Sequence, residues 1–111
     1  MGGSTKFSSN NTKHVLITES YYLKIKVATR IVFKISNTFS EWAKAFDDNR
    51  ANQEAAGIKA IFRGVSETDS STVMAILEAE PGVLDKYMEG NKDVEASGHI
   101  IGSEEFSNWM A

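Results

Sequence analysis

The sequence predicts an α+β domain whose elements follow the order strand, helix, strand, strand, helix, strand. Two stretches have the apolar spacing of helices, and the segments around them alternate or are rich in strand-forming residues. A short polar link between the second and third strands suits a hairpin. This order is that of the ferredoxin-like fold, a four-stranded antiparallel sheet with two helices on one face. The chain of 111 residues is long enough for one such domain.

The first strand is expected over residues 24–35, where apolar and basic residues alternate. One parity holds the apolar residues Ile25, Val27, Ile31, Phe33 and Ile35. The other parity holds the basic residues Lys24, Lys26, Arg30 and Lys34. A period of two is typical of a strand with one buried face, so the basic side chains are expected on the opposite face.

The first helix is expected to begin at the capping box formed by Thr38 and Glu41 and to end near Gly57. Its apolar stripe has helical spacing and consists of Phe39, Trp42, Ala43 and Phe46. Such a stripe is typical of a helix that faces the core. The same spacing is a weaker indication of a cofactor site.

The second and third strands are expected at residues 58–66 and 72–79, on either side of the polar link ETDSS. Pro81 is expected to open the second helix, because proline is tolerated in the first turn. This helix is expected to end at Gly98, and the last strand to run from there to Met110.

Residues 1–23 are expected to form an N-terminal arm, and residues 24–111 the ferredoxin-like domain. The first 13 residues are rich in Gly, Ser and Asn and are expected to be disordered or loosely attached. Residues 14–23, which include His14, are expected to form a short strand or an arm that packs on another surface.

Composition excludes several classes of protein. The chain contains no cysteine, so disulfides, thiol nucleophiles and thiolate metal sites are excluded. It has neither a run of about 18 apolar residues nor an apolar signal segment, so we expect no membrane span and a cytoplasmic location. The net charge of −3 argues against a nucleic-acid partner.

Charge is unevenly distributed along the chain. Residues 1–66 contain ten Lys and Arg and five Asp and Glu, whereas residues 67–111 contain two and ten. One interpretation is ordinary solvated surface charge. The other is a positive patch on the first strand and helix that attracts an anionic group.

Both faces of the third strand are predicted to avoid water. Val73, Ala75 and Leu77 share one parity, while Met74 and Ile76 share the other. The two helices cover one face of the sheet only, so the other face is expected to be an interaction surface. A two-fold homodimer, packed sheet against sheet, is the simplest arrangement that covers it.

Three stretches carry a resemblance to a known family: FSEWAKAFD at 39–47, AGIKAIFRGVS at 56–66 and NKDVEASGHI at 91–100. They resemble an uncharacterised family known mainly from cyanobacteria, which is similar to the dimeric α+β barrel superfamily. The resemblance covers residues 27–102 and implies the fold and a dimer. Relatives in that superfamily include cofactor-free monooxygenases, haem-degrading enzymes and binding proteins, so the resemblance implies no single activity.

His99 is the candidate catalytic residue, since it follows a helix terminator at the start of an expected strand. A general base needs a carboxylate or a substrate within hydrogen-bond reach, and no neighbour in sequence supplies one. A structural histidine at a strand end is therefore the competing interpretation. Two isolated histidines do not form a metal or haem ligand set, so we expect no metal and no cofactor.

Arg63 and Arg30 are the candidate ligand-binding residues. Arg63 lies among apolar neighbours in the second strand, and a guanidinium in such surroundings suits a carboxylate or phosphate. The apolar walls of a ligand pocket around this guanidinium are expected from Phe62, Met74 and Ile76. Trp42 is a further candidate for a cavity wall. The competing interpretation is an arginine whose stem packs while its head reaches water or a surface carboxylate.

Three functions remain open at this point. The first is a homodimer that binds an apolar or amphipathic molecule, such as a fatty-acid-like carboxylic acid, between sheet and helices or between two sheets. The second is a cofactor-free enzyme, similar to a monooxygenase, that acts on an aromatic or lipid-like substrate with His99 as base. The third is a structural or regulatory dimer without a ligand.

Overall fold

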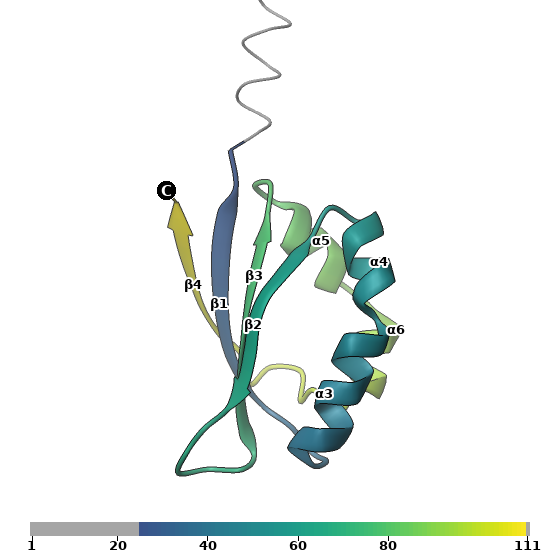
Figure 1. Ribbon diagram of the computed structural model, residues 1–111, viewed down its shortest axis with the longest axis vertical. Coiled ribbons are helices and arrows are strands. Elements are labelled where there is room, and N and C mark those ends of the chain that lie inside the picture. Colours follow the sequence, from purple (N-terminus) through teal and green to yellow (C-terminus); the bar gives the residue numbers. More distant parts are fainter. Residues whose placement is uncertain (1–24, 111) are drawn as a thin grey trace, which may run out of the picture.

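The computed structural model describes residues 25–110, which form a four-stranded antiparallel sheet in the order β2-β3-β1-β4. The strands are β1 (Val27–Lys34), β2 (Lys59–Val65), β3 (Thr72–Ala79) and β4 (Glu105–Met110). The helices are α3 (Phe39–Asp48), α4 (Arg50–Ala55), α5 (Val83–Met88) and α6 (Lys92–Ala96). These helices lie on one side of the sheet (Figure 1). The ferredoxin-like α+β prediction is therefore confirmed. The expected arm at 1–23, with His14, lies outside the described residues.

The core lies between the sheet and the helices. On the buried face of the sheet, residues of β1 and β3 lie side by side, since Ile31 pairs with Ala75 and Phe33 with Val73. Trp42 of α3 closes this layer from the helix side and is 2% exposed. The parity predicted for the buried face of the first strand is confirmed.

Each predicted helix is in fact two short helices. Asn49 separates α3 from α4, and residues 89–91 separate α5 from α6. The second break has a local cause, because Gly90 has a positive φ of 63° and Asn91 caps α6 by accepting from the backbone N–H groups of Asp93 and Val94. The capping box predicted for the first helix is present, with Thr38 and Glu41 bonded reciprocally.

A bulge changes the direction of side chains in β2. Ala60 pairs with Leu77 and Phe62 pairs with Ile76, so Ile61 has no partner in β3. One extra residue in a strand exchanges the faces of all residues after it. Phe62 therefore lies on the face away from the helices, while Arg63 lies on the helix face.

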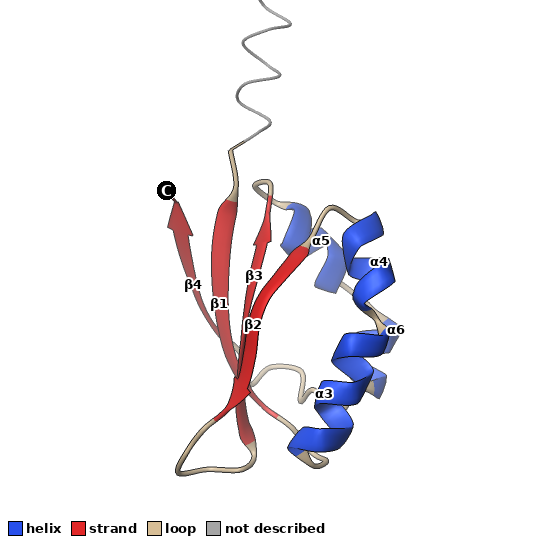
Figure 2. Ribbon diagram, in the orientation of Figure 1, coloured by secondary structure: helices blue, strands red, loops and turns tan. Residues whose placement is uncertain are grey.

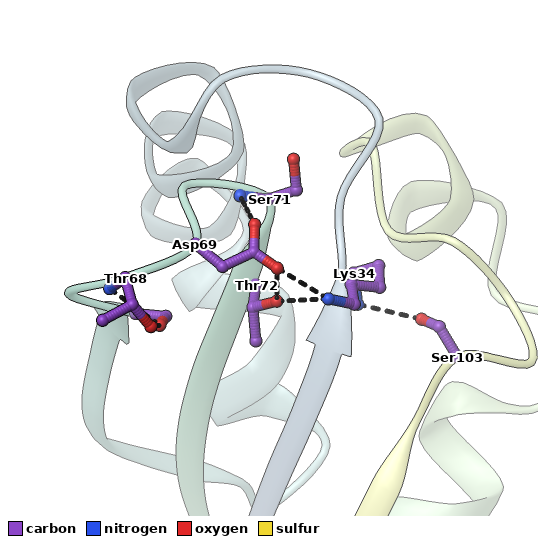
Figure 3. A network of polar contacts seen from close by, with 7 residues as sticks. Lys34, Thr68, Asp69, Ser71, Thr72 and Ser103 are labelled. Atoms are coloured by element: carbon purple, nitrogen blue, oxygen red, sulfur yellow. Dashed lines mark hydrogen bonds and ion pairs between the residues drawn. The ribbon is translucent and has the colours of Figure 1, made fainter.

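The hairpin between β2 and β3 is closed by a polar network around Asp69 (Figure 3). Asp69 accepts hydrogen bonds from the backbone N–H of Ser71 at 2.9 Å, the hydroxyl of Thr72 at 2.7 Å and Lys34 Nζ at 2.8 Å. The backbone N–H of Lys34 in turn donates to the Ser103 hydroxyl at 2.9 Å. The network thus ties the hairpin and the approach to β4 to the end of β1.

The last strand is shorter than predicted. His99 makes only an isolated bridge to Ile35, and β4 begins at Glu105. A turn at Gly102, with φ +95°, separates the two. Figure 2 shows that, within residues 25–110, no helix covers the sheet face opposite the core. Nor does any helix in this range have the length and apolar character needed to cross a membrane.

Candidate functional site

The inner cavity is a space of about 60 Å³ between the sheet and the helices. Apolar side chains from both layers form most of its wall, among them Ile31, Phe33, Trp42, Phe46, Leu77 and Leu84. A few polar side chains reach the same space, namely Asn49, Gln53, Tyr87, Asp93, Ser97 and His99. Apolar walls with a small number of polar groups are the usual form of a small-molecule site.

His99 reaches the inner cavity from the segment between α6 and β4. Its ring stacks on that of Phe33, with centroids 4.0 Å apart. Its Nε2 lies 2.5 Å from Oε2 of Glu104, and the two side chains are 3% and 14% exposed. The histidine is therefore buried, with its ring held by an aromatic face and a carboxylate.

The turn at Gly102 brings Glu104 back to His99. The backbone N–H of Gly102 donates to Oε1 of Glu104 at 2.9 Å. Burial by itself raises the pKa of Glu104, but hydrogen bonds from His99 and from backbone N–H groups outweigh burial and lower the pKa. Glu104 is thus a carboxylate at neutral pH, and the histidine nitrogen that faces it is a donor.

This pair has the arrangement of a general base. When Nε2–H of a neutral imidazole donates to a carboxylate, Nδ1 keeps its lone pair and can accept a proton. The sequence showed no carboxylate for His99, and the fold supplies Glu104. The structural interpretation of His99 also keeps its support, because Ile35 and Phe33 fix the residue in the core.

Gln53 and Tyr87 give the inner cavity further polar character. Gln53 is 5% exposed, and its Oε1 has no hydrogen-bond partner among the described residues. The Tyr87 hydroxyl accepts from Asn49 Nδ2 at 2.6 Å. Burial raises the pKa of Tyr87 against the opposing effect of this hydrogen bond, so the hydroxyl stays protonated.

The outer face of the sheet, away from the helices, carries four of the six predicted ligand-binding residues. A groove of about 310 Å³ is lined by Arg30, Phe62 and Met74 among others. Ile76 lies beside this groove as the cross-strand partner of Arg30. Arg30 donates to the Ser107 hydroxyl at 3.4 Å and makes no ion pair within residues 25–110.

Arg63 lies on the helix side of the sheet and already has an anionic partner. Its Nε and Nη2 donate to the two carboxylate oxygens of Asp47 at 2.8 and 2.7 Å. Its guanidinium also lies 5.8 Å from the centre of the Phe39 ring. The sheet thus separates Arg63 from Phe62, Met74 and Ile76. The carboxylate bound by Arg63, which was expected to belong to a ligand, is that of Asp47.

Other basic residues of the first half of the chain are paired as well. Lys34 Nζ lies 2.8 Å from Asp69, and Lys26 Nζ lies 3.6 Å from Glu80. Both acidic partners come from the acidic second half. The uneven charge of the sequence is therefore partly balanced within the fold, which favours the interpretation as ordinary surface charge.

Trp42 lines the inner cavity as one of its aromatic walls. Its ring centroid lies 5.5 Å from that of Phe33 and 5.0 Å from that of Phe46. Of the predicted ligand-binding residues, Trp42 is the one that the structure places with His99 at the same cavity.

Sequence reasoning missed Glu104 and Gln53. Glu104 follows His99 by five residues with Gly102 between them, which is a turn signal. Gln53 follows Phe46 by seven residues and so lies on the apolar stripe of the first helix, where a polar side chain is out of place. No three His, Asp or Glu side chains converge as a metal site within the part of the chain that the structure describes.

Comparison with known proteins identifies a family and a fold. The model of a family described as a domain of unknown function (DUF3764) matches residues 25–111. No curated protein sequence matches. A proposed antibiotic biosynthesis monooxygenase from Caulobacter crescentus has a similar structure, with a TM-score of 0.55 and 18% identity over 86% of this chain and 97% of that chain. At this identity the likeness establishes the fold alone.

A second structure is more distant. It is LarC2, the C-terminal domain of a cyclometallase involved in the synthesis of the NPN cofactor of lactate racemase, in its apo form. Its TM-score is 0.46 at 9% identity, and the match covers 77% of this chain and 56% of that chain.

Proposed function

This chain belongs to the DUF3764 family of domains of unknown function, and we propose that it is a homodimer that holds an apolar or amphipathic small molecule. The proposal is based on the geometry of the chain itself. The observation that carries the proposal is the inner cavity, where aromatic and aliphatic walls surround a few buried polar groups. Gln53 supports it, since its side chain lines the cavity and its Oε1 is buried without a partner among the described residues. The cytoplasmic location expected from the sequence is part of this proposal.

The outer face supports the dimer. Its centre is apolar, with Val32, Met74 and Ile76 side by side on β1 and β3, and Phe62 beside them is 50% exposed. Charges of both signs surround this centre, including Lys59 and Glu78, which are cross-strand partners. An apolar centre within a mixed-charge rim suits a second copy related by a two-fold axis, because each patch then meets its own complement.

The carboxylic acid expected from the sequence loses its support at the inner cavity. That expectation depended on a guanidinium without a partner among apolar side chains. Arg63 pairs with Asp47 and is not part of the cavity wall. Of the two arginines predicted to bind an acid, Arg30 is the one that remains a candidate. An acid bound by Arg30 would lie between the two sheets of the dimer.

Native mass spectrometry of protein purified from cells tests the proposed function. The expected result is a dimer mass that carries an additional small molecule, released when the protein is denatured. A dimer without an additional mass, even after incubation with small apolar compounds, would favour the structural dimer. A monomer at micromolar concentration would contradict the homodimer.

A cofactor-free enzyme is the second candidate, and the His99–Glu104 pair favours it. In such a reaction Nδ1 of His99 accepts a proton from the substrate while the Glu104 carboxylate stabilises the resulting imidazolium. Incubating the co-purified molecule with the dimer under air, and following the mass of that molecule, detects turnover. Turnover that His99→Gln abolishes while circular dichroism shows the fold retained at the assay temperature would favour the enzyme, whereas an unchanged molecule favours binding.

A further inference from the structure

A groove in the helix layer adjoins the inner cavity. This helix groove has a volume of about 330 Å³ and lies between the α3–α4 pair and α6. It shares four lining residues with the inner cavity, namely Ala45, Asn49, Asp93 and Ser97. The shared residues place the two spaces side by side at the Asn49 break, and we take this shared wall as the entrance to the inner cavity.

The entrance has acidic and neutral polar groups but no basic ones. Asp48 and Asp93 line the helix groove, and neither it nor the inner cavity is lined by lysine or arginine. Asp48 is paired with Lys44 at 2.6 Å. Asp93 is exposed and makes no ion pair among the described residues, so it disfavours an anion at the entrance.

Gln53 specifies what the buried part of a ligand must carry. Its side chain lines the inner cavity, it is 5% exposed, and its Oε1 lacks a partner within residues 25–110. A buried carbonyl oxygen without a donor is unfavourable. A ligand with an N–H or O–H group would remove this penalty, whereas an ether or a carboxylate would not.

The volumes limit the size of the buried part. An engineered protein cavity of about 150 Å³ accommodates a benzene ring, and the inner cavity has about 60 Å³. Only a few atoms of a ligand therefore fit without movement of the helices.

Building on the proposed function, we propose that the inner cavity takes a short apolar molecule with an alcohol or amine group and rejects the matching carboxylate. The hydroxyl or amine donates to Oε1 of Gln53. A positively charged amine is also attracted by the Asp93 carboxylate at the entrance, which repels the matching carboxylate. This assigns the ligand a class different from the fatty-acid-like molecule that the sequence suggested.

Fluorescence of Trp42 provides a local test. The chain has two tryptophans, and Trp109→Phe leaves Trp42, on the cavity wall, as the only one. Four probes of nearly equal size are titrated into this variant: pentan-1-ol, pentylamine, butyl methyl ether and pentanoate. The alcohol and the amine are expected to bind, and the ether and pentanoate to bind about tenfold more weakly or less.

Two variants separate the roles of Gln53 and Asp93. Gln53→Met keeps the size of the side chain and removes the acceptor, so pentan-1-ol should lose its advantage over the ether. Asp93→Asn should strengthen pentanoate binding several-fold and leave pentan-1-ol unchanged. Asp85→Asn is the matched control, since Asp85 is a neighbouring exposed carboxylate outside the cavity and the entrance, and it should change neither.

The outcomes distinguish this inference from the proposed function. Binding of pentanoate as tight as that of pentan-1-ol would overturn the ligand class and leave small-molecule binding intact. An alcohol advantage that survives in Gln53→Met would overturn the role of Gln53. No change in Trp42 emission with any probe would overturn both the ligand class and the use of this cavity.

Discussion

The contact between His99 and Glu104 differs from the Lys and Arg ion pairs of the described residues in its burial. Its side chains are 3% and 14% exposed, whereas the side chains of the remaining pairs are all at least 32% exposed. Exposed pairs contribute little to stability because water and salt screen them. A buried pair behaves differently, since removal of one partner leaves the other desolvated without compensation.

Replacing Glu104 by Gln should therefore destabilise the domain in a pH-dependent way. The change keeps the shape and removes the charge that His99 faces, and we expect a loss of about 1–3 kcal/mol at pH 7. The pKa of Glu104 is below its usual 4.5 in the folded state, so its contribution is present above about 4.5 and is lost as the pH falls through the folded value. Urea unfolding of both proteins between pH 7 and pH 3 measures the difference, which should shrink toward the acid end.

The neighbouring Glu105 provides the control for this prediction. It is an exposed carboxylate at the start of β4, and Glu105→Gln removes the same charge without touching His99. An equal, pH-dependent loss in Glu105→Gln would show that the His99 contact is not the cause.

The helix layer is joined to the sheet at Gly98, between α6 and β4. Gly98 has a φ of +98°, and its carbonyl accepts from the backbone N–H of Ser36 at 2.9 Å. A Cβ atom at this position would overlap the side chain of Asn37. Asn37 is itself held by a 2.9 Å hydrogen bond to the carbonyl of Ser97, so it cannot move aside without losing that bond.

Gly98→Ala should accordingly cost much more stability than Gly90→Ala. Gly90 also has a positive φ, of 63°, but a Cβ there would meet no atom within 4 Å. The backbone penalty alone is about 1–2 kcal/mol, and the overlap with Asn37 adds about 1–3 kcal/mol. Thermal and urea unfolding of the two variants measure the difference. Equal losses would mean that Asn37 gives way freely.

Predictability from sequence also differs between elements. The α3 capping box and the alternation in β1 were predictable because they are local patterns that determine local geometry. The bulge at Ile61 was not, because an unpaired residue is defined only by its partner strand. That one residue decides which face Arg63 occupies, and with it the composition of the predicted site. Glu104 was missed for a similar reason, since its contact with His99 depends on a turn.

At the scale of the whole molecule, the two faces of the sheet are unequally covered. The core face is closed by the helices over β1 and β3. On the edge strand β4, side chains remain exposed on both faces, with Phe106 at 51% on the helix side and Trp109 at 64% on the outer side. Trp109 lies on the same outer face as Val32, Met74 and Ile76, and exposed apolar side chains on one face are typical of an interaction surface.

Met74→Asp tests whether this surface joins two copies. Met74 lies in the middle of the outer face, on β3 opposite Val32 and Gly64, and is only half-buried within one chain. A charge there would be desolvated in a dimer that buries about 800 Å² per partner but partly hydrated in a monomer, so we expect a folded monomer. Ala55→Asp is the matched control, because it adds the same charge to an exposed position of α4 and should remain dimeric. Sedimentation velocity with circular dichroism of both variants measures mass and fold together. A dimer that persists unchanged in Met74→Asp would place the interface elsewhere, since a two-fold axis puts both copies of the new carboxylate in the same layer.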